Sequence, residues 1–213
     1  MRAGWPLSNH GVRASWRDGL GSRRRARVLA RHIAPLIPRG GVVLDLGAGN
    51  GRLGKAVLDL RRDVLLSAVD IKLPTKAYMA VRRFDGVTLP HGDASVDAVL
   101  ISDVLHHADD PIRLLREAVR IARHVIIIKD FIQADWFDRQ TLRLIDWVER
   151  LPAALGPSGH YWSAGEWTLA LQRVGAQIES WETDLAIYPW PASVLFGRSM
   201  HFVARLRPAL RRA

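Results

Sequence analysis

The sequence predicts a doubly wound α/β fold in which helices cover both faces of a mostly parallel β-sheet. Short apolar runs of strand length alternate with segments of helical periodicity along the chain. The first run, residues 42–46, leads directly into a glycine cluster, as strands do in nucleotide-binding α/β folds. No internal repeat interrupts the alternation, so we expect one sheet.

The first half of the chain begins with a helix and then alternates strand and helix. Residues 22–37 place apolar side chains at helical spacing opposite an arginine-rich face, and Pro38 follows this helix. The elements expected after it are a strand at 42–46, a helix at 51–60, a strand at 64–70, a short helix at 74–78 and a brief strand leading to residue 84.

The second half continues the pattern with clearer helix boundaries. Asp110 is a suitable N-cap and Pro111 a suitable first helical residue for a helix ending near residue 122. Ser163 and Glu166 form the pattern of a capping box, and Gly175 closes that helix. The other elements expected are strands at 96–102 and 124–129, a helix at 136–150, a loop at 151–161 and strands at 177–183 and 199–206.

Composition indicates one globular domain of 213 residues, because 48% of them are apolar and only 24% are charged. The chain has no cysteine, which excludes disulfides, thiolate metal sites and cysteine nucleophiles. It has no apolar run of the length needed to span a membrane and no recognisable signal peptide. We therefore expect a soluble, cytoplasmic protein.

The formal net charge of +10 is concentrated at the two ends of the chain. Residues 1–41 hold nine arginines and one acid, residues 198–213 hold five arginines and no acid, and the part between carries 17 basic and 20 acidic groups. A nearly neutral body argues against nucleic acid as the partner. Basic ends are more often solvated faces or contact surfaces for membranes and polyanions.

The segment from residue 43 to residue 51, VLDLGAGNG, is the main candidate for a ligand-binding site. A strand that turns through glycines into a helix exposes backbone N–H groups to a nucleotide-like ligand at the carboxyl edge of the sheet. Residues 49–54 also satisfy the dinucleotide pattern G-x-G-x-x-G, so the glycines alone fit two ligand classes.

Two acids help to separate these classes. Asp45 lies two residues before the first glycine, where its charge would repel a pyrophosphate but attract the sulfonium and ammonium of S-adenosylmethionine. Asp70 ends the second strand, where a carboxylate can accept both ribose hydroxyls of either ligand.

The segment around Asp45 resembles the first motif of class I S-adenosylmethionine-dependent methyltransferases, and the resemblance extends over about residues 40–130. Residues 85–90, DGVTLP, are similar to the segment whose acid meets the adenine in the subgroup that methylates small molecules (type 11-like). Residues 93–99 and 102–107 are similar to the segments that enter and follow the fourth strand. The segment after that strand lacks the Asn/Asp-Pro-Pro-aromatic sequence of amino-methylating DNA enzymes.

The resemblance implies a seven-stranded Rossmann-like sheet with an antiparallel last strand, and S-adenosyl-L-methionine as cofactor. It divides the domain into a basic N-terminal helical extension (1–41), a cofactor-binding half (42–130) and an acceptor-side half (131–213). No metal site is expected. The residues expected to bind the cofactor are Asp45, Gly47, Ala48, Gly49, Asn50, Gly51, Asp70, Ile71, Asp85, Gly86, Ser102 and Asp103.

The acceptor is expected beyond the carboxyl ends of strands four to six, where the loops are rich in aromatic residues. This composition predicts a small apolar, aromatic or lipid-like acceptor; the alternative is that these rings form a satellite core. The aromatic residues concerned are Trp136, Phe137, Tyr161, Trp162, Tyr188, Trp190 and Phe196.

Methyl transfer needs a base only when the nucleophile must lose a proton. His106, His107 and His160 are the candidates because imidazole titrates near neutrality, and Tyr161 and Asp130 are weaker ones.

Three other functions compete with small-molecule methylation. They are methylation of nucleic acid or protein docked on the basic ends, a cofactor-binding protein without turnover, and a nicotinamide-dependent oxidoreductase, which Asp45 disfavours. The arginines at positions 23, 24, 25 and 27 further suggest that the N-terminal helix contacts an anionic membrane.

Overall fold

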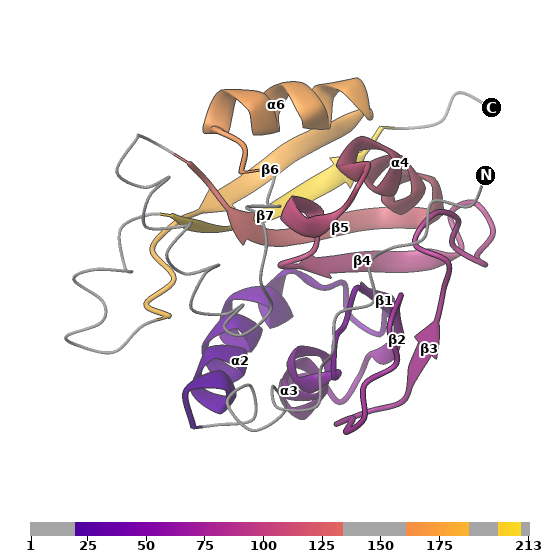
Figure 1. Cartoon of the computed structure of the whole chain (residues 1–213), viewed down its shortest axis with the longest axis vertical. Coiled ribbons are helices and arrows are strands. Elements are labelled where there is room, and N and C mark those ends of the chain that lie inside the picture. The colour runs from indigo at the N-terminus through magenta and orange to yellow at the C-terminus, as the bar shows by residue number, and fades with distance from the viewer. Residues whose placement is uncertain (1–19, 134–160, 188–199, 210–213) are drawn as a thin grey trace, which may run out of the picture.

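The computed structural model describes residues 20–133, 161–187 and 200–209, and these form a seven-stranded sheet between two layers of helices (Figure 1). The strand order is β3-β2-β1-β4-β5-β7-β6. Neighbours from β3 to β5 are parallel, whereas β7 runs antiparallel to both β5 and β6. The predicted doubly wound sheet with an antiparallel last strand is confirmed.

Most of the predicted elements are present within the described residues. The strands are β1 (Val42–Leu46), β2 (Leu65–Asp70), β3 (Val81–Arg83), β4 (Val96–Ser102), β5 (Ala122–Phe131), β6 (Ala176–Glu182) and β7 (His201–Pro208). The helices are α2 (Leu20–Ile33), α3 (Arg52–Leu60), α4 (Pro111–Ile121) and α6 (Ala164–Arg173), with short 3-10 turns η1 (Ala34–Leu36) and η2 (Leu105–His107). The helix predicted at 136–150 lies outside the described residues, as does all but the last residue of the loop predicted at 151–161.

Alternating strand residues separate the apolar core into two layers. On one face, β1, β4 and β5 pack against α4, α6 and η2; on the other they pack against α2 and α3, as Figure 1 shows. In β5, for example, Ile126 and Ile128 belong to the first layer, and Val125 and Ile127 to the second. Because the central strands are covered on both faces, they are almost continuously apolar.

The caps predicted from sequence are also present. Asp110 accepts a hydrogen bond from the Arg113 N–H at the start of α4. At α6 the hydroxyl of Ser163 accepts from the Glu166 N–H while the Glu166 carboxylate accepts from the Ser163 N–H, which completes a capping box. These local hydrogen bonds set where both helices begin.

The short helix predicted at 74–78 is wrong, because residues 71–80 form bends without helix. The Tyr78 N–H donates to the Asn50 carbonyl at 2.9 Å, so it is not available to a local turn. Met79 packs at the same time against the positions of Gly51 and Gly54. Contacts with the glycine turn therefore determine the path of this segment. No helix among the described residues is long and apolar enough to cross a membrane.

Candidate active site

The glycine turn after β1 is held by backbone hydrogen bonds and has one open side. The N–H groups of Gly47 and Ala48 both donate to the Val69 carbonyl at the end of β2. Gly47, Gly49 and Gly51 have φ values of +74°, +58° and +72°, in the left-handed region that favours glycine. A Cβ at Gly47 would lie 2.3 Å from a methyl of Val104, whereas a Cβ at Gly49 would meet no atom within 4 Å. Gly49 therefore faces the space in which a ligand can approach the backbone.

Asp45 places a buried carboxylate directly behind this turn. Its side chain is only 2% exposed, and Oδ2 has no hydrogen-bond partner among the described residues. A Cβ at Gly54 would lie 2.9 Å from that oxygen, so the third glycine of the pattern lets α3 pack closely on β1. Burial, and next the negative charge of Asp70, raise the pKa of Asp45 to about 7. A cationic ligand group near Oδ2 would relieve both effects.

Asp70 connects the end of β2 to the glycine turn. One of its oxygens accepts from the Gly49 N–H at 2.7 Å and the other from the Lys72 N–H at 2.9 Å. The side chain of Ile71 packs on the far side, within 3.0 Å of where a Cβ of Gly86 would lie. The turn, Asp70 and Ile71 thus lie together at the carboxyl edge of β1 and β2.

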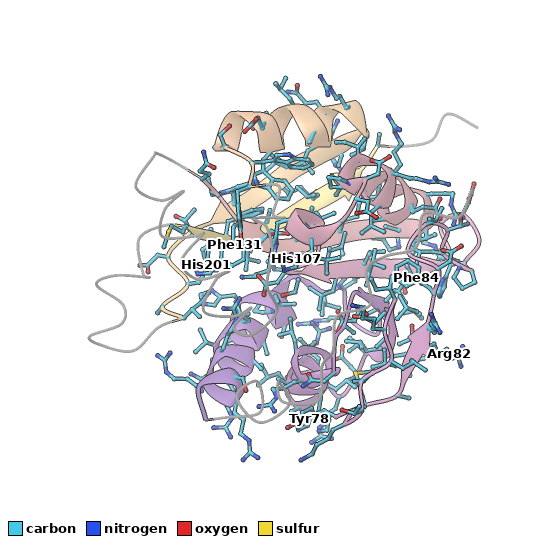
Figure 2. The ribbon with its side chains drawn as sticks, in the orientation of Figure 1. Tyr78, Arg82, Phe84, His107, Phe131 and His201 are labelled. Carbon is cyan, nitrogen blue, oxygen red and sulfur yellow. The ribbon has the colours of Figure 1, made fainter. Side chains whose placement is uncertain are left out.

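A second polar cluster lies at the carboxyl edge of β4 and β5. His106, in η2, is 4% exposed and its Nδ1 lies 2.6 Å from Oδ1 of Asp130 at the end of β5. The His106 ring stacks on Tyr161 with a centroid distance of 5.6 Å and meets the edge of Phe131 at 5.0 Å. Figure 2 shows His107, Phe131 and His201 gathered at this edge.

A protein-family model described as a methyltransferase domain matches residues 44–125, which include the glycine turn, Asp70 and His106. Residues 44–125 thus belong to a methyltransferase domain.

Part of the chain is also similar to a curated protein. The chain is 33% identical over 109 residues to the bifunctional methionine biosynthesis protein MetXA/MetW of Rhodopirellula baltica, a match that covers 45% of this chain and 18% of that protein. The chain thus corresponds to under a fifth of this relative's length.

Two solved structures show the same fold. A chain from the complex between the Haloferax volcanii Trm112 methyltransferase activator and its methyltransferase partner superposes with a TM-score of 0.67 at 18% identity, covering 95% of this chain and 100% of the other. Magnesium protoporphyrin IX methyltransferase of Synechocystis PCC 6803, solved with bound S-adenosylhomocysteine, superposes with a TM-score of 0.58 at 15% identity, covering 97% and 90%.

The other residues predicted to bind the cofactor differ in how many hydrogen bonds their side chains make within the protein. Asn50 accepts from the Arg52 N–H through its side chain, which helps to begin α3. Asp85 is exposed, and its Oδ1 accepts from the N–H groups of Val87 and Thr88, which lowers the pKa of Asp85. Asp85 thus organises its own turn, and the bonds to that turn use one of its two oxygens.

Asp103 carries more contacts than its predicted role required. It has a φ of +57° directly after Ser102, and it accepts from Arg25 at 2.7 Å and from the ammonium of Lys129. Burial would raise its pKa, but the charges of Lys129 and Arg25 outweigh that effect and lower the pKa of Asp103 far below its ordinary value. Ser102 ends β4 at the carboxyl edge and Asp103 follows it, and the next residue, Val104, contacts the Gly47 position.

The residues predicted as possible bases differ in burial and in their contacts. His106 is buried and paired, His107 is exposed on the same 3-10 turn, Tyr161 stacks on His106, and His160 lies outside the described residues. The structure therefore brings His106, Tyr161 and the weaker candidate Asp130 into one cluster.

Three residues that sequence reasoning did not select complete the cluster. Lys129 is 0% exposed and donates to Nδ1 of His201 at 3.2 Å, and Arg25 reaches in from α2. Burial, and then the positive charges of Lys129 and Arg25, hold the pKa of His201 well below its ordinary value, so it accepts as a neutral imidazole. A lysine and an aspartate after three consecutive isoleucines were the available sequence signal for Lys129, because unpaired charges are rarely buried.

Proposed function

We propose that this protein transfers the methyl group of S-adenosylmethionine to a small apolar, aromatic or lipid-like acceptor. The buried, unpartnered Oδ2 of Asp45 behind an open Gly49 carries the proposal for the cofactor. A pyrophosphate there would be repelled by Asp45 and Asp70 together, whereas a sulfonium or ammonium is attracted by both. The residues that would hold the cofactor are those of the glycine turn with Asp45, Asp70, Ile71 and the Asp85 turn.

Aromatic walls support an apolar acceptor. Phe131 and Tyr161 meet edge to face at 5.8 Å, and both belong to a small apolar cluster with Met200, apart from the two main core layers. Trp162 instead packs on Trp167 of α6, against the main core and partly buried. The other aromatic residues expected to line the acceptor space, at positions 136, 137, 188, 190 and 196, lie outside the described residues.

This chain's contribution to methyl transfer is alignment and exclusion of water. The reaction is an in-line displacement in which a positive charge disappears from sulfur, so a dry, apolar site favours it. The glycine turn and the cluster around His106 lie at the carboxyl edges of adjacent strands, β1 and β4–β5. An acceptor bound beside His106 would therefore face a methyl donor bound at the glycine turn.

Calorimetric titration with S-adenosylhomocysteine and with NAD tests the cofactor assignment. We expect the intact protein to bind S-adenosylhomocysteine and not NAD, and Asp70→Ala to lose most of that binding. Asp59→Ala, on the exposed face of α3 beside Lys55, is the matched control and should bind normally. Binding of NAD alone would contradict the proposal.

The exposed arginines of α2 favour contact with an anionic membrane. The contact would be through charge alone, because the apolar face of the helix is buried in the protein. Ala26, Leu29 and Ile33 are buried in the core layer or against it, so α2 has no apolar face to insert into lipid. Arg24 donates to the Ile187 carbonyl and Arg25 binds Asp103, so both point into the protein. An exposed stripe remains at i, i+4 and i+8: Arg23, Arg27 and Arg31.

This arginine stripe would bind acidic lipid headgroups by charge alone. We expect the protein to float with vesicles of phosphatidylglycerol but not phosphatidylcholine, and to lose flotation at high salt. The triple variant Arg23→Glu, Arg27→Glu, Arg31→Glu should not float, while its S-adenosylhomocysteine binding is unchanged. Equal flotation of the triple variant, or preferential retention on duplex DNA in competition, would contradict membrane docking.

A further inference from the structure

We propose that the acceptor is methylated on a hydroxyl oxygen, and that His106, held by Asp130, removes the hydroxyl proton. This inference rests on the proposed methyl-transfer function and names the acceptor group for the same site. It is carried by the geometry of the buried pair and by the residues that enclose the imidazole.

Asp130 fixes which nitrogen of His106 can act as a base. Its carboxylate is 0% exposed and accepts from three donors: the Leu105 N–H at 3.1 Å on Oδ2, and the Phe131 N–H at 2.9 Å and His106 Nδ1 at 2.6 Å on Oδ1. With Oδ1 of Asp130 as the acceptor, Nδ1 of His106 is the donor and carries the hydrogen. The lone pair of the neutral imidazole is therefore on Nε2.

Three rings pack around the imidazole of His106. Tyr161 stacks on the imidazole with an interplanar angle of 18°, Phe131 meets it edge-on, and the ring centroid of His107 lies 3.9 Å away. No described residue donates to or accepts from Nε2. His106 is therefore fixed by a hydrogen bond of 2.6 Å at Nδ1 and by ring packing, while no described residue bonds to Nε2. This arrangement suits Nε2 to accept a proton.

Charges around the pair favour an oxygen nucleophile over an ammonium. The charged and titratable groups that face His106 are Asp130 and Lys129 from β5, Asp103 after β4, His107 from η2, His201 from β7 and Tyr161. Burial opposes protonation of the imidazole, but Asp130 and then Asp103 outweigh it and raise the pKa of His106 above its ordinary value. An amine cation would meet Lys129 and Arg25, whereas an oxygen that gains negative charge is stabilised by them.

The proposed step balances without a further reactant. The hydroxyl proton passes to Nε2 of His106 as the oxygen lone pair forms the new bond to the methyl carbon. The carbon–sulfur bond breaks, and its electron pair remains on sulfur as the neutral thioether. The charge that leaves sulfur thus reappears as the imidazolium beside Asp130, which later releases its proton to solvent.

The first test does not depend on turnover. In protein labelled with ¹⁵N-histidine, nuclear magnetic resonance should show His106 as the Nδ1–H tautomer, assigned by its loss in His106→Gln. In Asp130→Asn the same imidazole should titrate at lower pH, because the main interaction that raises its pKa is lost. His124→Gln is the matched control, since His124 lies exposed at the other end of β5, 3.7 Å from Asp97. An Nε2–H tautomer, or an unchanged titration in Asp130→Asn, would overturn the inference.

The second test uses matched naphthalene probes that differ only in the nucleophile: naphthol, naphthylamine and naphthalenethiol. We expect methylation of naphthol, with a rate that rises with pH as His106 loses its proton. His106→Gln and Asp130→Asn should lower kcat by about 10²–10⁴-fold, the usual contribution of a positioned base, with unchanged S-adenosylhomocysteine affinity. Asp130→Glu should recover part of the rate, His124→Gln should retain all of it, and a nitronaphthol that is already ionised should lose much less in the variants.

The outcomes separate this inference from the function on which it rests. Preferential methylation of the amine or thiol, full turnover by His106→Gln, or no methylation of naphthol by protein that still binds S-adenosylhomocysteine would each overturn oxygen methylation through His106. Failure to bind S-adenosylhomocysteine would instead overturn the proposed function itself.

Discussion

At pH 8, Asp45→Asn should make the ligand-free protein more stable, and it should weaken binding of the cofactor. The carboxylate is buried without a partner for Oδ2, and its pKa is raised from 3.8 to about 7. The folded state therefore binds more protons than the unfolded state once the pH exceeds 3.8, and the free energy of unfolding falls as the pH rises through that window. Asparagine has no charge to lose or gain, so it removes this dependence.

The size of the effect follows from the shift. A displacement of the Asp45 pKa from 3.8 to about 7 destabilises the folded state by about 4 kcal/mol at pH 8 and by about 2 kcal/mol at pH 5, at about 1.36 kcal/mol per pKa unit. The amide of asparagine in the same place lacks partners as well, which costs about 1–3 kcal/mol at any pH. The diagnostic quantity is therefore the difference: Asp45→Asn should gain about 2 kcal/mol more at pH 8 than at pH 5.

Urea unfolding of both proteins at the two pH values measures this difference, with calorimetry for the cofactor. S-adenosylhomocysteine should bind the variant about 10–100-fold more weakly, because a hydrogen bond between charged groups contributes about 1.5–3 kcal/mol. Asp59→Asn, an exposed residue paired with Lys55, should show no such pH-dependent gain. Equal stability changes at both pH values would refute the argument that the buried charge of Asp45 destabilises the ligand-free protein and is stabilised by a cationic ligand.

The other predictions concern the backbone of the site and one helix cap. Gly49→Ala should fold with a loss of about 1 kcal/mol, the cost of a left-handed alanine, and should bind S-adenosylhomocysteine poorly because its methyl enters the open side of the turn. Gly47→Ala should lose several times more stability in the same thermal melts, because its methyl would lie 2.3 Å from Val104; similar losses for both variants would contradict the geometry. Ser163→Ala should cost about 1 kcal/mol through loss of the capping box and leave cofactor binding unchanged, and a calorimetric loss of affinity would show that α6 has another role.

The sequence by itself determined the features that depend on neighbours along the chain. β1 and β4 have the bounds predicted from their apolar runs, and the caps at Asp110 and Ser163 are the expected ones. The glycine turn with Asp45 before it and Asp70 after the next strand was likewise sufficient to indicate the cofactor. Each of these features depends on side-chain types at a fixed short spacing, and residues close in sequence are necessarily close in space.

Only the tertiary structure decided which distant charges meet. Arg25 and Asp103 are 78 positions apart, Lys129 and His201 are 72, and His106 and Asp130 are 24. The same packing turned Arg24 and Arg25 inward and left Arg23 exposed, and it drew residues 74–78 over the glycine turn against their local helical tendency. The physical reason is that burial and ion pairing depend on which elements the sheet brings side by side, and the strand order places the ends of β1, β4 and β5 at one edge whatever lies between them in sequence.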